Sequence, residues 1–407
     1  MTGSGDPAHA IDDLQPTTPD ALPVIIATNF REVGQTGIHT HIAQWRGYLE
    51  QQGSMVDLVT PFSWNRVLAS LVFAPRLALK YVNKPASLWW YRRWHQIFLR
   101  KGLQRRLARL GDCVIYAQGP LEAKAALRAR RGRHQRVIMA VHFRTSQADE
   151  HAEPGREIKP HSALFRAIRR FEREVIPRLD GIMYVSNWAR DALLQWLPEA
   201  TLVPSTVIGN AVAPVVAEPR VPPLADLVSV GRLDEPKNHR FILDVLAEAR
   251  KAGRELTLDI YGDGLLRGTL KRQAEMLGLA GQVRLHGFRS DVRTFLPSYR
   301  VYVHASYRET SSLAIIEAMA ASLPIVAGGI GPITELCGDG VEVRFWPLDD
   351  PAEAAASLLD LLDSEAAMES ASRAALKRFE QDFDVNVVGA RMRSFLIHAG
   401  TIVPPAA

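Results

Sequence analysis

The sequence predicts an α/β protein with two doubly wound domains, each built on a parallel sheet. At 407 residues the chain is too long for one ordinary hydrophobic core and suits two domains of about 150 to 200 residues. Residues 299–336 have the pattern strand, loop, helix, strand, which is the crossover unit of a parallel sheet. Four prolines among residues 213–224 mark a linker between the two domains.

These features set the expected boundaries. We expect a flexible tail over residues 1–22, a first domain over 23–212, the linker over 213–224, a second domain over 225–382 and a final helix within 383–400.

Composition narrows the class of protein. The hydrophobic share of 47% and the charged share of 23% are those of a globular protein. The first twenty residues lack the apolar core of a secretory signal, and no run approaches the roughly 18 apolar residues of a spanning helix. The two cysteines have no metal-ligand or redox spacing, which favours a reducing, cytoplasmic setting. A formal charge of +5 indicates an anionic partner: nucleic acid, a phospholipid surface or a phosphorylated substrate.

The first domain opens with an apolar strand from Pro23, a glycine-bearing loop and a helix over 38–49, followed by a strand over 55–60. Strands return at 113–117 and 137–141. The second of these runs into His142, where the chain can reach a ligand cleft. A lone histidine at a strand end is more often structural.

Residues 58–111 have an unusual composition, with eleven Lys or Arg, nine aromatic residues and no Asp or Glu. Trp90, Trp94 and Phe98 share one helical face, but the apolar positions after Gly102 rotate to another side. This pattern predicts two short helices or a kinked one. The aromatic residues either pack inward beneath a solvated basic face, or enter a lipid interface whose anionic headgroups the basic residues meet.

The second domain opens with a strand that ends at Gly231 and a helix that begins beyond Lys237. Arg232 and Lys237 can therefore reach one phosphate pocket, where their charge suits a departing diphosphate. A helix is expected near 351–380. The pair Asp382 and Asp384 after it imitates a metal-binding Asp-x-Asp, but its place late in the chain argues against a metal site.

Two carboxylates bracket the turn of the crossover unit, Glu309 and Glu317. The helix that starts at Ser311, Ser312 and Leu313 offers backbone N–H groups and a dipole that attract an anion. Glutamates beside an anion site would repel a phosphate, so they more plausibly accept hydrogen bonds from sugar hydroxyls. For an isolated pair, loop solvation and a surface salt bridge would be the ordinary explanation.

The segment from Glu309 to Glu317, followed by EAMAASLPIVA, Gly328-Gly329 and Glu335, resembles the retaining nucleotide-sugar glycosyltransferases of family 4. That family carries a Glu-x7-Glu signature and the GT-B fold, in which two Rossmann-like doubly wound domains face a central cleft. The resemblance covers about residues 23–398. It implies that Glu309 contacts the transferred sugar, that Glu317 holds the ribose, and that the final helix crosses back to the first domain.

The same resemblance implies the other site residues. His142, Arg232 and Lys237 would join Glu309 as catalytic groups. The donor would be bound by Arg232, Lys237, Glu317 and these further residues: Thr36, Gly37, Gly287, Phe288, Arg289, Ser311, Ser312 and Leu313. Where the family has adjacent glycines this chain has Thr36-Gly37, so a plain helix-start turn is the alternative there. No metal and no cofactor are implied.

The expected activity is therefore a retaining hexosyl transfer from a nucleoside diphosphate sugar. Two kinds of alternative function compete with it. Within the fold, an epimerase or a phosphorylase would share the donor site, but neither explains the basic aromatic span 58–111. A basic nucleic-acid-binding protein would suit the charge, yet no nucleic-acid module is recognisable. The span instead favours a lipid-linked or cell-envelope glycan acceptor, and peripheral attachment to an anionic membrane at its cytoplasmic face.

Overall fold

The computed structural model describes residues 22–31, 34, 37–153, 156–216, 220 and 222–399. The chain forms two compact units. The N-unit runs to Gly209, the C-unit spans Asn210–Val388, and the chain from Gly389 onward belongs to the N-unit again. The expected tail 1–22 lies outside the described residues except for Leu22, and the expected linker 213–224 is described only in part.

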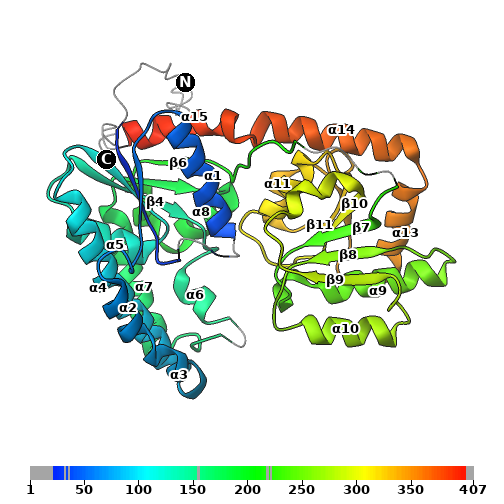
Figure 1. Ribbon diagram of the computed structural model, residues 1–407, viewed down its shortest axis with the longest axis horizontal. Coiled ribbons are helices and arrows are strands. Elements are labelled where there is room, and N and C mark those ends of the chain that lie inside the picture. The colour runs from blue at the N-terminus through cyan, green and yellow to red at the C-terminus, as the bar shows by residue number, and fades with distance from the viewer. Residues whose placement is uncertain are drawn as a thin grey trace, which may run out of the picture. The chain divides into compact units, whose positions relative to one another are not determined.

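The N-unit is built on a six-stranded parallel sheet in the order β2-β1-β3-β4-β5-β6 (Figure 1). Its strands are β1 (Val24–Ala27), β2 (Val56–Val59), β3 (Cys113–Ala117), β4 (Gln135–Val141), β5 (Gly181–Tyr184) and β6 (Ser205–Val207). Its outer helices include α1 (Gly37–Gln51), α5 (Pro120–Ala129), α6 (Gln147–His151), α7 (Ala163–Val175) and α8 (Asn187–Trp196). Since β1 lies between β2 and β3, the strand order reverses there, which is where such sheets bind ligands.

Between β2 and β3 the chain forms α2 (Arg66–Phe73), α3 (Pro75–Val82) and α4 (Lys84–Leu107). The first of the two alternatives for this span, two short helices, is wrong, because α4 is a single helix of 24 residues. Gly102 allows close packing instead, since a Cβ there would lie only 3.0 Å from Val59 Cγ1 of β2. One buried stripe passes through the glycine, formed by Leu88, Arg92, His95, Leu99, Leu103 and Leu107.

Most tryptophans of this span face protein rather than solvent. The Trp90 Nε1–H donates to the carbonyl of Val72 in α2 at 2.9 Å, and the Trp94 ring lies 5.8 Å from that of Trp90. Trp64 packs on α4 from the preceding loop. Trp90 therefore helps to fix α2 on α4, as the inward-packing alternative expects, and a lipid contact of the other aromatic residues stays a prediction. Trp89 is 53% exposed.

The C-unit holds a second six-stranded parallel sheet, in the order β12-β11-β10-β7-β8-β9. Its strands are β7 (Ala225–Val230), β8 (Leu258–Tyr261), β9 (Val283–Gly287), β10 (Tyr299–His304), β11 (Ile325–Gly328) and β12 (Arg344–Trp346). Alternate residues of β10 face opposite layers. Val301 and Val303 join the core under α9 (His239–Lys251), α10 (Arg267–Met276) and α13 (Pro351–Leu362), whereas Tyr302 joins the core under α11 (Leu313–Ala320) and α14 (Glu365–Asp382). A short helix α12 (Gly331–Leu336) follows β11.

The single helix expected near 351–380 is in fact two, α13 and α14. The break falls at Ser364, whose hydroxyl oxygen accepts a hydrogen bond from the Ala367 amide and so starts α14. Asp382 pairs with Arg378 at 3.1 Å, and Asp384 accepts from the Asn386 amide at 2.8 Å. Both carboxylates of the Asp-x-Asp pair therefore have structural partners.

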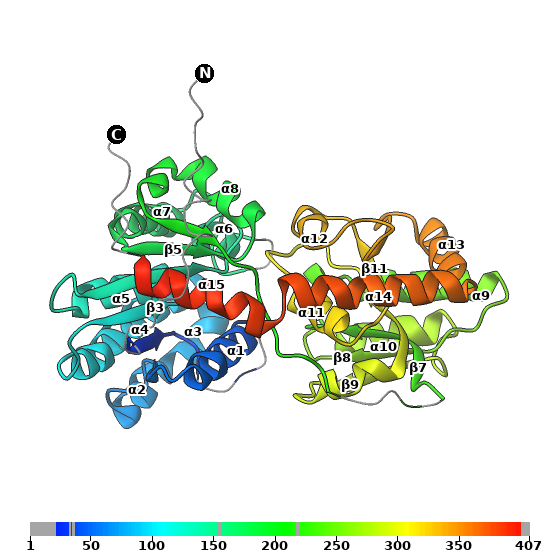
Figure 2. The ribbon, with the colours of Figure 1, turned by 90° about the horizontal axis from the view of Figure 1, so that it is seen from above.

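The last helix, α15 (Val385–His398), follows α14 directly (Figure 2). Its final turns pack on the N-unit sheet, where a Cβ on Gly181 of β5 would lie 3.2 Å from Phe395 and 3.0 Å from Ala399. Within the described part of the chain, no helix is both long and apolar enough to cross a bilayer.

Candidate functional site

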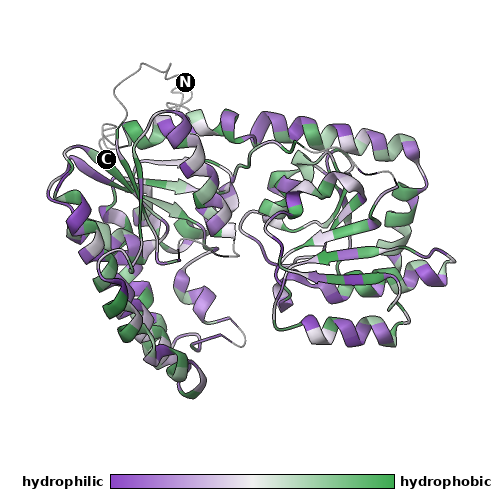
Figure 3. Cartoon of the chain, in the orientation of Figure 1, coloured by the Kyte–Doolittle hydropathy of each residue, from purple (hydrophilic) through white to green (hydrophobic). Residues whose placement is uncertain are grey.

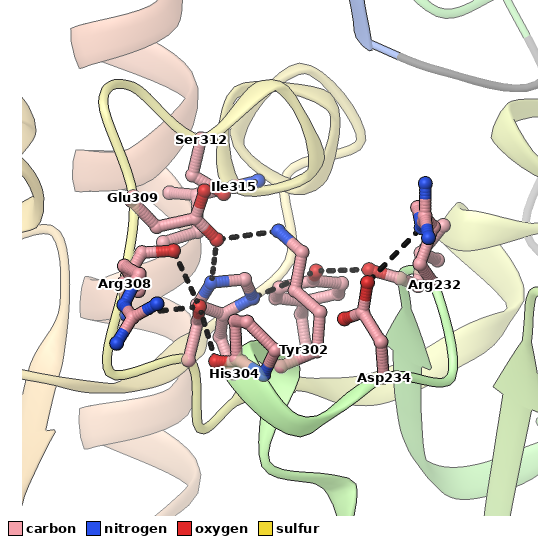
Figure 4. Close-up of polar contacts among 12 residues, drawn as sticks. Arg232, Asp234, Tyr302, His304, Arg308, Glu309, Ser312 and Ile315 are labelled. Carbon is pink, nitrogen blue, oxygen red and sulfur yellow. Dashed lines mark hydrogen bonds and ion pairs between the residues drawn. The ribbon is translucent and has the colours of Figure 1, made fainter. Parts of the chain in front are cut away.

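The C-unit brings Glu309 and Lys237 into direct contact. Glu309 lies in the loop between β10 and α11, and its side chain is 9% exposed. Its Oε1 accepts a hydrogen bond from Lys237 Nζ at 2.5 Å and lies 3.0 Å from His304 Nε2 (Figure 4). One buried carboxylate oxygen is thus shared by a lysine and a histidine.

These partners decide the charge of Glu309. Burial alone would raise the pKa of its carboxyl, but Lys237 and His304 outweigh burial and hold the pKa at about 2. Burial lowers the pKa of His304, against the opposing effect of Glu309. We therefore assign a neutral imidazole whose Nε2–H donates to the carboxylate, with Nδ1 3.4 Å from the Tyr302 hydroxyl.

The position of Lys237 depends on a contact between two loops. Lys237 ends the short 3₁₀ helix Glu235–Lys237, which follows β7. The carbonyl of Pro236 in that helix accepts from Ser306 Oγ at 2.9 Å and from the Tyr307 amide at 3.1 Å. Because β7 and β10 are neighbours in the sheet, these bonds tie the lysine loop to the Glu309 loop.

Arg232 lies in the same loop after β7 but does not join this cluster. Its guanidinium pairs with Asp234 at 3.0 Å, and its side chain is 60% exposed, against 24% for Lys237. In Figure 4 the Arg232 side chain lies on the far side of the group from Glu309. An exposed cation near a less exposed one is suited to a ligand that arrives from solvent.

The start of α11 provides an anion-binding end of a helix. Ser312 is the N-cap, and its side chain accepts from the Ile315 amide at 3.4 Å. The first amides of a helix have no intrahelical acceptor, so those at Ser311, Ser312 and Leu313 are suited to a phosphate. The buried Ser311 hydroxyl oxygen has no hydrogen-bond partner among the described residues.

Glu317 lies one turn further along α11 and has a different environment from Glu309. Its Oε1 lies 3.7 Å from Arg293 Nε, and its side chain is 12% exposed. Burial raises the pKa of Glu317 to about 7, with Arg293 opposing the rise. Arg293 also donates to the carbonyl of Ala213. The two glutamates of the signature therefore differ in pKa: Glu309 has a pKa of about 2 and Glu317 a pKa of about 7.

The three residues expected beside the nucleotide base follow β9, at the same carboxyl edge of the sheet. Gly287 is the last residue of that strand, and β7 and β8 separate it from β10. The Phe288 side chain is 44% exposed. The Arg289 guanidinium pairs with Asp291 at 2.7 Å and stacks over the Phe295 ring. Among the described residues, the contacts found for these three residues do not reach Glu309.

In the N-unit, His142 is held at the carboxyl end of β4. Its Nε2 lies 3.0 Å from Gln118 Oε1, which follows β3, and its ring meets the edge of His41 from α1 at 4.5 Å. Burial lowers the pKa of His142 to about 4, so the ring is neutral near pH 7. Gly37 is the first residue of α1, and Thr36 lies outside the described residues.

Sequence reasoning missed three residues of these clusters: His304, Arg293 and Gln118. His304 and Gln118 could have been found, because each is a polar residue at the end of an apolar strand, as His142 is. Arg293 has no such signal, since its approach to Glu317 comes from a separate loop that only the folded chain brings near.

Two family models match the chain in succession. Residues 35–214 match the model described as Glycosyltransferase Family 4, and residues 225–364 match that described as Glycosyl transferases group 1. The second match contains Lys237, Glu309 and Glu317, and the first contains His142.

Among curated proteins, the chain is similar to a glycogen synthase of Mycobacterium tuberculosis (strain H37Rv), at 29% identity over 233 residues, 56% of this chain and 56% of that protein. It is also similar to LpsE of Rhizobium meliloti, named as a lipopolysaccharide core biosynthesis glycosyltransferase, at 35% identity over 33% of this chain and 39% of the other. The chain thus matches about half the length of such relatives or less.

Solved structures share the fold across nearly the whole chain. Sucrose-phosphate synthase from Thermosynechococcus elongatus superposes with a TM-score of 0.71 at 15% identity, covering 91% of this chain and 97% of that one. Anabaena HepE in complex with UDP-glucose gives a TM-score of 0.67 at 18% identity, with coverage of 92% and 99%. Two six-stranded parallel sheets with flanking helices are the GT-B architecture that these structures have.

Proposed function

We propose that this chain, which belongs to the family 4-like glycosyltransferases, transfers a hexose from a nucleoside diphosphate sugar to an acceptor with retention of anomeric configuration. The observation that carries the proposal is the Lys237–Glu309–His304 cluster beside the start of α11. It combines a buried carboxylate for sugar hydroxyls with a lysine and helix amides for phosphates.

Each group has one role in this proposal. The amides of Ser311, Ser312 and Leu313 bind the diphosphate, and Lys237 with Arg232 stabilises the charge that develops as it leaves. Glu309 accepts hydrogen bonds from the transferred sugar, and Glu317 accepts those of the ribose. His142 contacts the donor sugar from the N-unit. The donor would also meet Thr36 and Gly37 at its phosphates, and Gly287, Phe288 and Arg289 at its base.

The proposed route needs no covalent nucleophile from the protein. Glu309, the carboxylate nearest the cations, is occupied by two hydrogen-bond donors and is suited to holding hydroxyls. The acceptor would attack from the face that the diphosphate leaves, and a donor phosphate oxygen would take the acceptor proton. Lys237, Arg232 and the helix dipole supply the positive charge, so the proposal includes no metal ion and no cofactor.

A structural neighbour supports the choice of donor, and the basic span with a curated relative supports the choice of acceptor. Because the structural neighbour HepE is described in complex with UDP-glucose, a UDP-hexose is the first donor to test. The basic span 58–111 and the similarity to LpsE favour a lipid-linked or cell-envelope glycan intermediate as acceptor, reached at the cytoplasmic face of a membrane.

The test is the configuration of the product. Incubation with an α-linked UDP-hexose and a panel of lipid-linked and soluble glycan acceptors should give an α-linked product, read from the anomeric proton coupling by NMR. The Lys237→Ala variant serves as the matched control for enzyme-dependent transfer. A β-linked product would overturn retention, and free interconversion of the donor without an acceptor would point to an epimerase.

A further inference from the structure

The N-unit exposes a row of apolar side chains on α2 and α3. Seven of the sixteen large hydrophobic residues that are exposed in the described part of the chain fall between Val67 and Trp89. Figure 3 shows hydrophobic colouring along this helical pair. Single exposed apolar residues need no explanation, but such a concentration marks an interaction surface.

Helical spacing places these residues on common faces. Val67 and Leu71 are four residues apart on α2, as are Leu77 and Tyr81 on α3, and Val82 follows. These five side chains, here called the α2–α3 face, are 66 to 88% exposed.

The opposite sides of the same helices are fixed to the protein. The Phe73 ring of α2 stacks on His95 of α4 at 4.1 Å between centroids, and Ala69 is buried. The Trp90 bond to Val72 adds a directional tie. On α3, the Arg76 guanidinium lies over the Tyr91 ring of α4 at 4.4 Å, so both helices are tied to α4 on the side away from the α2–α3 face.

The charge around the face selects its partner. The span 58–111 has no carboxylate, and Arg66 on α2, Lys80 on α3 and Lys84 at the start of α4 are exposed. Two cations further along α4 face protein: Arg92 is buried and donates to Gln147, and Arg106 pairs with Asp57. An apolar surface whose own helices carry only positive charge complements an anionic lipid bilayer, where apolar side chains enter the interface and cations meet headgroups.

We propose that the α2–α3 face, with Arg66, Lys80 and Lys84, attaches this protein reversibly to anionic phospholipid membranes. The attachment rests on the proposed function only for the acceptor, which would be a lipid-linked molecule in the same bilayer. Vesicle binding itself requires no turnover.

The experiment is flotation of the full chain with vesicles of phosphatidylglycerol and phosphatidylcholine, compared with phosphatidylcholine alone. Replacing Arg66, Lys80 and Lys84 by Gln should weaken binding on the order of 10²-fold, because each cation near an anionic surface contributes about a fivefold gain. Its control is Lys251→Gln with Lys271→Gln and Arg272→Gln, which removes the same charge from α9 and α10 of the C-unit.

A second variant tests the apolar part. Leu71→Ser with Tyr81→Ser and Val82→Ser should abolish the binding that survives about 0.5 M salt, where charge attraction is screened. The equally exposed set Leu202→Ser, Leu265→Ser and Met276→Ser should bind as the wild type does. All of these positions are on the surface, so folding is expected to be preserved, and thermal unfolding of each variant checks it.

Several results would overturn the inference. A wild type that does not float with anionic vesicles at low salt would do so, as would charge and apolar variants that both float as well as the wild type. A dimer in sedimentation equilibrium that only the Leu71, Tyr81 and Val82 set dissociates would show that a second copy covers the face. Titration of UDP into the same samples separates this failure from failure of the proposed function, because Glu317 and Lys237, which are proposed to bind the ribose and the diphosphate, lie in the C-unit.

Discussion

Lys237 Nζ donates to Glu309 Oε1 at 2.5 Å, joining two residues that are 72 positions apart in the sequence. The pair stands at the carboxyl ends of β7 and β10, which are adjacent strands, and the bonds from Ser306 and Tyr307 to Pro236 hold the two loops together. The pairing of β7 with β10 and the bonds between their loops therefore place the cation and the carboxylate that the proposed reaction needs.

The first prediction concerns this lysine. Lys237→Ala should lower turnover on the order of 10²-fold, which is the usual effect of removing one preorganised stabiliser of transition-state charge. Arg232→Ala should lower it less, because that side chain is 60% exposed and water can partly replace it. The measurement is the initial rate of nucleotide release at saturating donor, with the surface change Lys251→Ala as control. Near-normal rates in both site variants would place the diphosphate elsewhere.

The second prediction concerns sugar choice. Glu309→Gln keeps the size of the side chain but removes the charge that Lys237 and His304 share, so contacts with sugar hydroxyls should change as well as the rate. We expect the ratio of kcat/KM values for two UDP-hexoses that differ at one hydroxyl to shift. Glu317→Gln is the comparison, since its proposed partner is the ribose common to both donors. An unchanged ratio in Glu309→Gln would remove this residue from the sugar site.

The third prediction is a pH dependence of nucleotide binding. Burial raises the pKa of Glu317 from its ordinary 4.5 to about 7, so its contribution to stability is complete below about pH 4.5 and is lost as the pH rises through 7. Ribose hydroxyls that donate to the carboxylate favour its ionised form. UDP affinity should therefore increase between about pH 5.5 and 8, with release of a proton.

Calorimetric titration in two buffers of different ionisation enthalpy measures that proton. Glu317→Gln cannot titrate at this position, so its affinity should be weaker and its proton release reduced. Identical pH profiles for the wild type and Glu317→Gln would contradict the ribose role.

The fourth prediction concerns metal ions. The described residues contain no group of three or more His, Cys, Asp or Glu placed to bind a metal ion, and Asp382 and Asp384 have structural partners. We expect EDTA to leave turnover unchanged, as should Asp382→Asn. A loss of activity with EDTA that Mg²⁺ or Mn²⁺ restores would show that lysine, arginine and helix amides do not suffice for the leaving diphosphate.

Local sequence patterns predicted two doubly wound domains, and they predicted that Lys237 and Glu309 lie in loops after apolar strands and that Glu317 lies in the following helix. Patterns did not predict that Lys237 would reach Glu309 while Arg232 would not. That difference depends on the pairing of β7 with β10 and on the Asp234 side chain, which are relations between distant segments.

What the sequence could not predict in the span 58–111 also depends on packing between distant segments. Periodicity after Gly102 suggested a rotated face, but α4 packs on two sides, against the sheet and against α2, so both sets of apolar positions are used in one helix. The sequence likewise does not show which tryptophans are covered by a neighbouring helix, so all four were candidates for lipid contact. Leu71, Tyr81 and Val82 are strongly exposed, which sequence alone does not report, and the membrane contact proposed above therefore uses these side chains.

The most direct test of the central claim is a donor titration. UDP-, GDP- and ADP-hexoses should be titrated calorimetrically into the wild type and Glu317→Ala, with slow nucleotide release followed in the same samples. The account predicts that at least one donor binds the wild type at submillimolar concentration and releases its nucleotide, and that Glu317→Ala binds it more weakly. If no nucleotide sugar binds the wild type at millimolar concentration, the cluster around Glu309 is not a donor site.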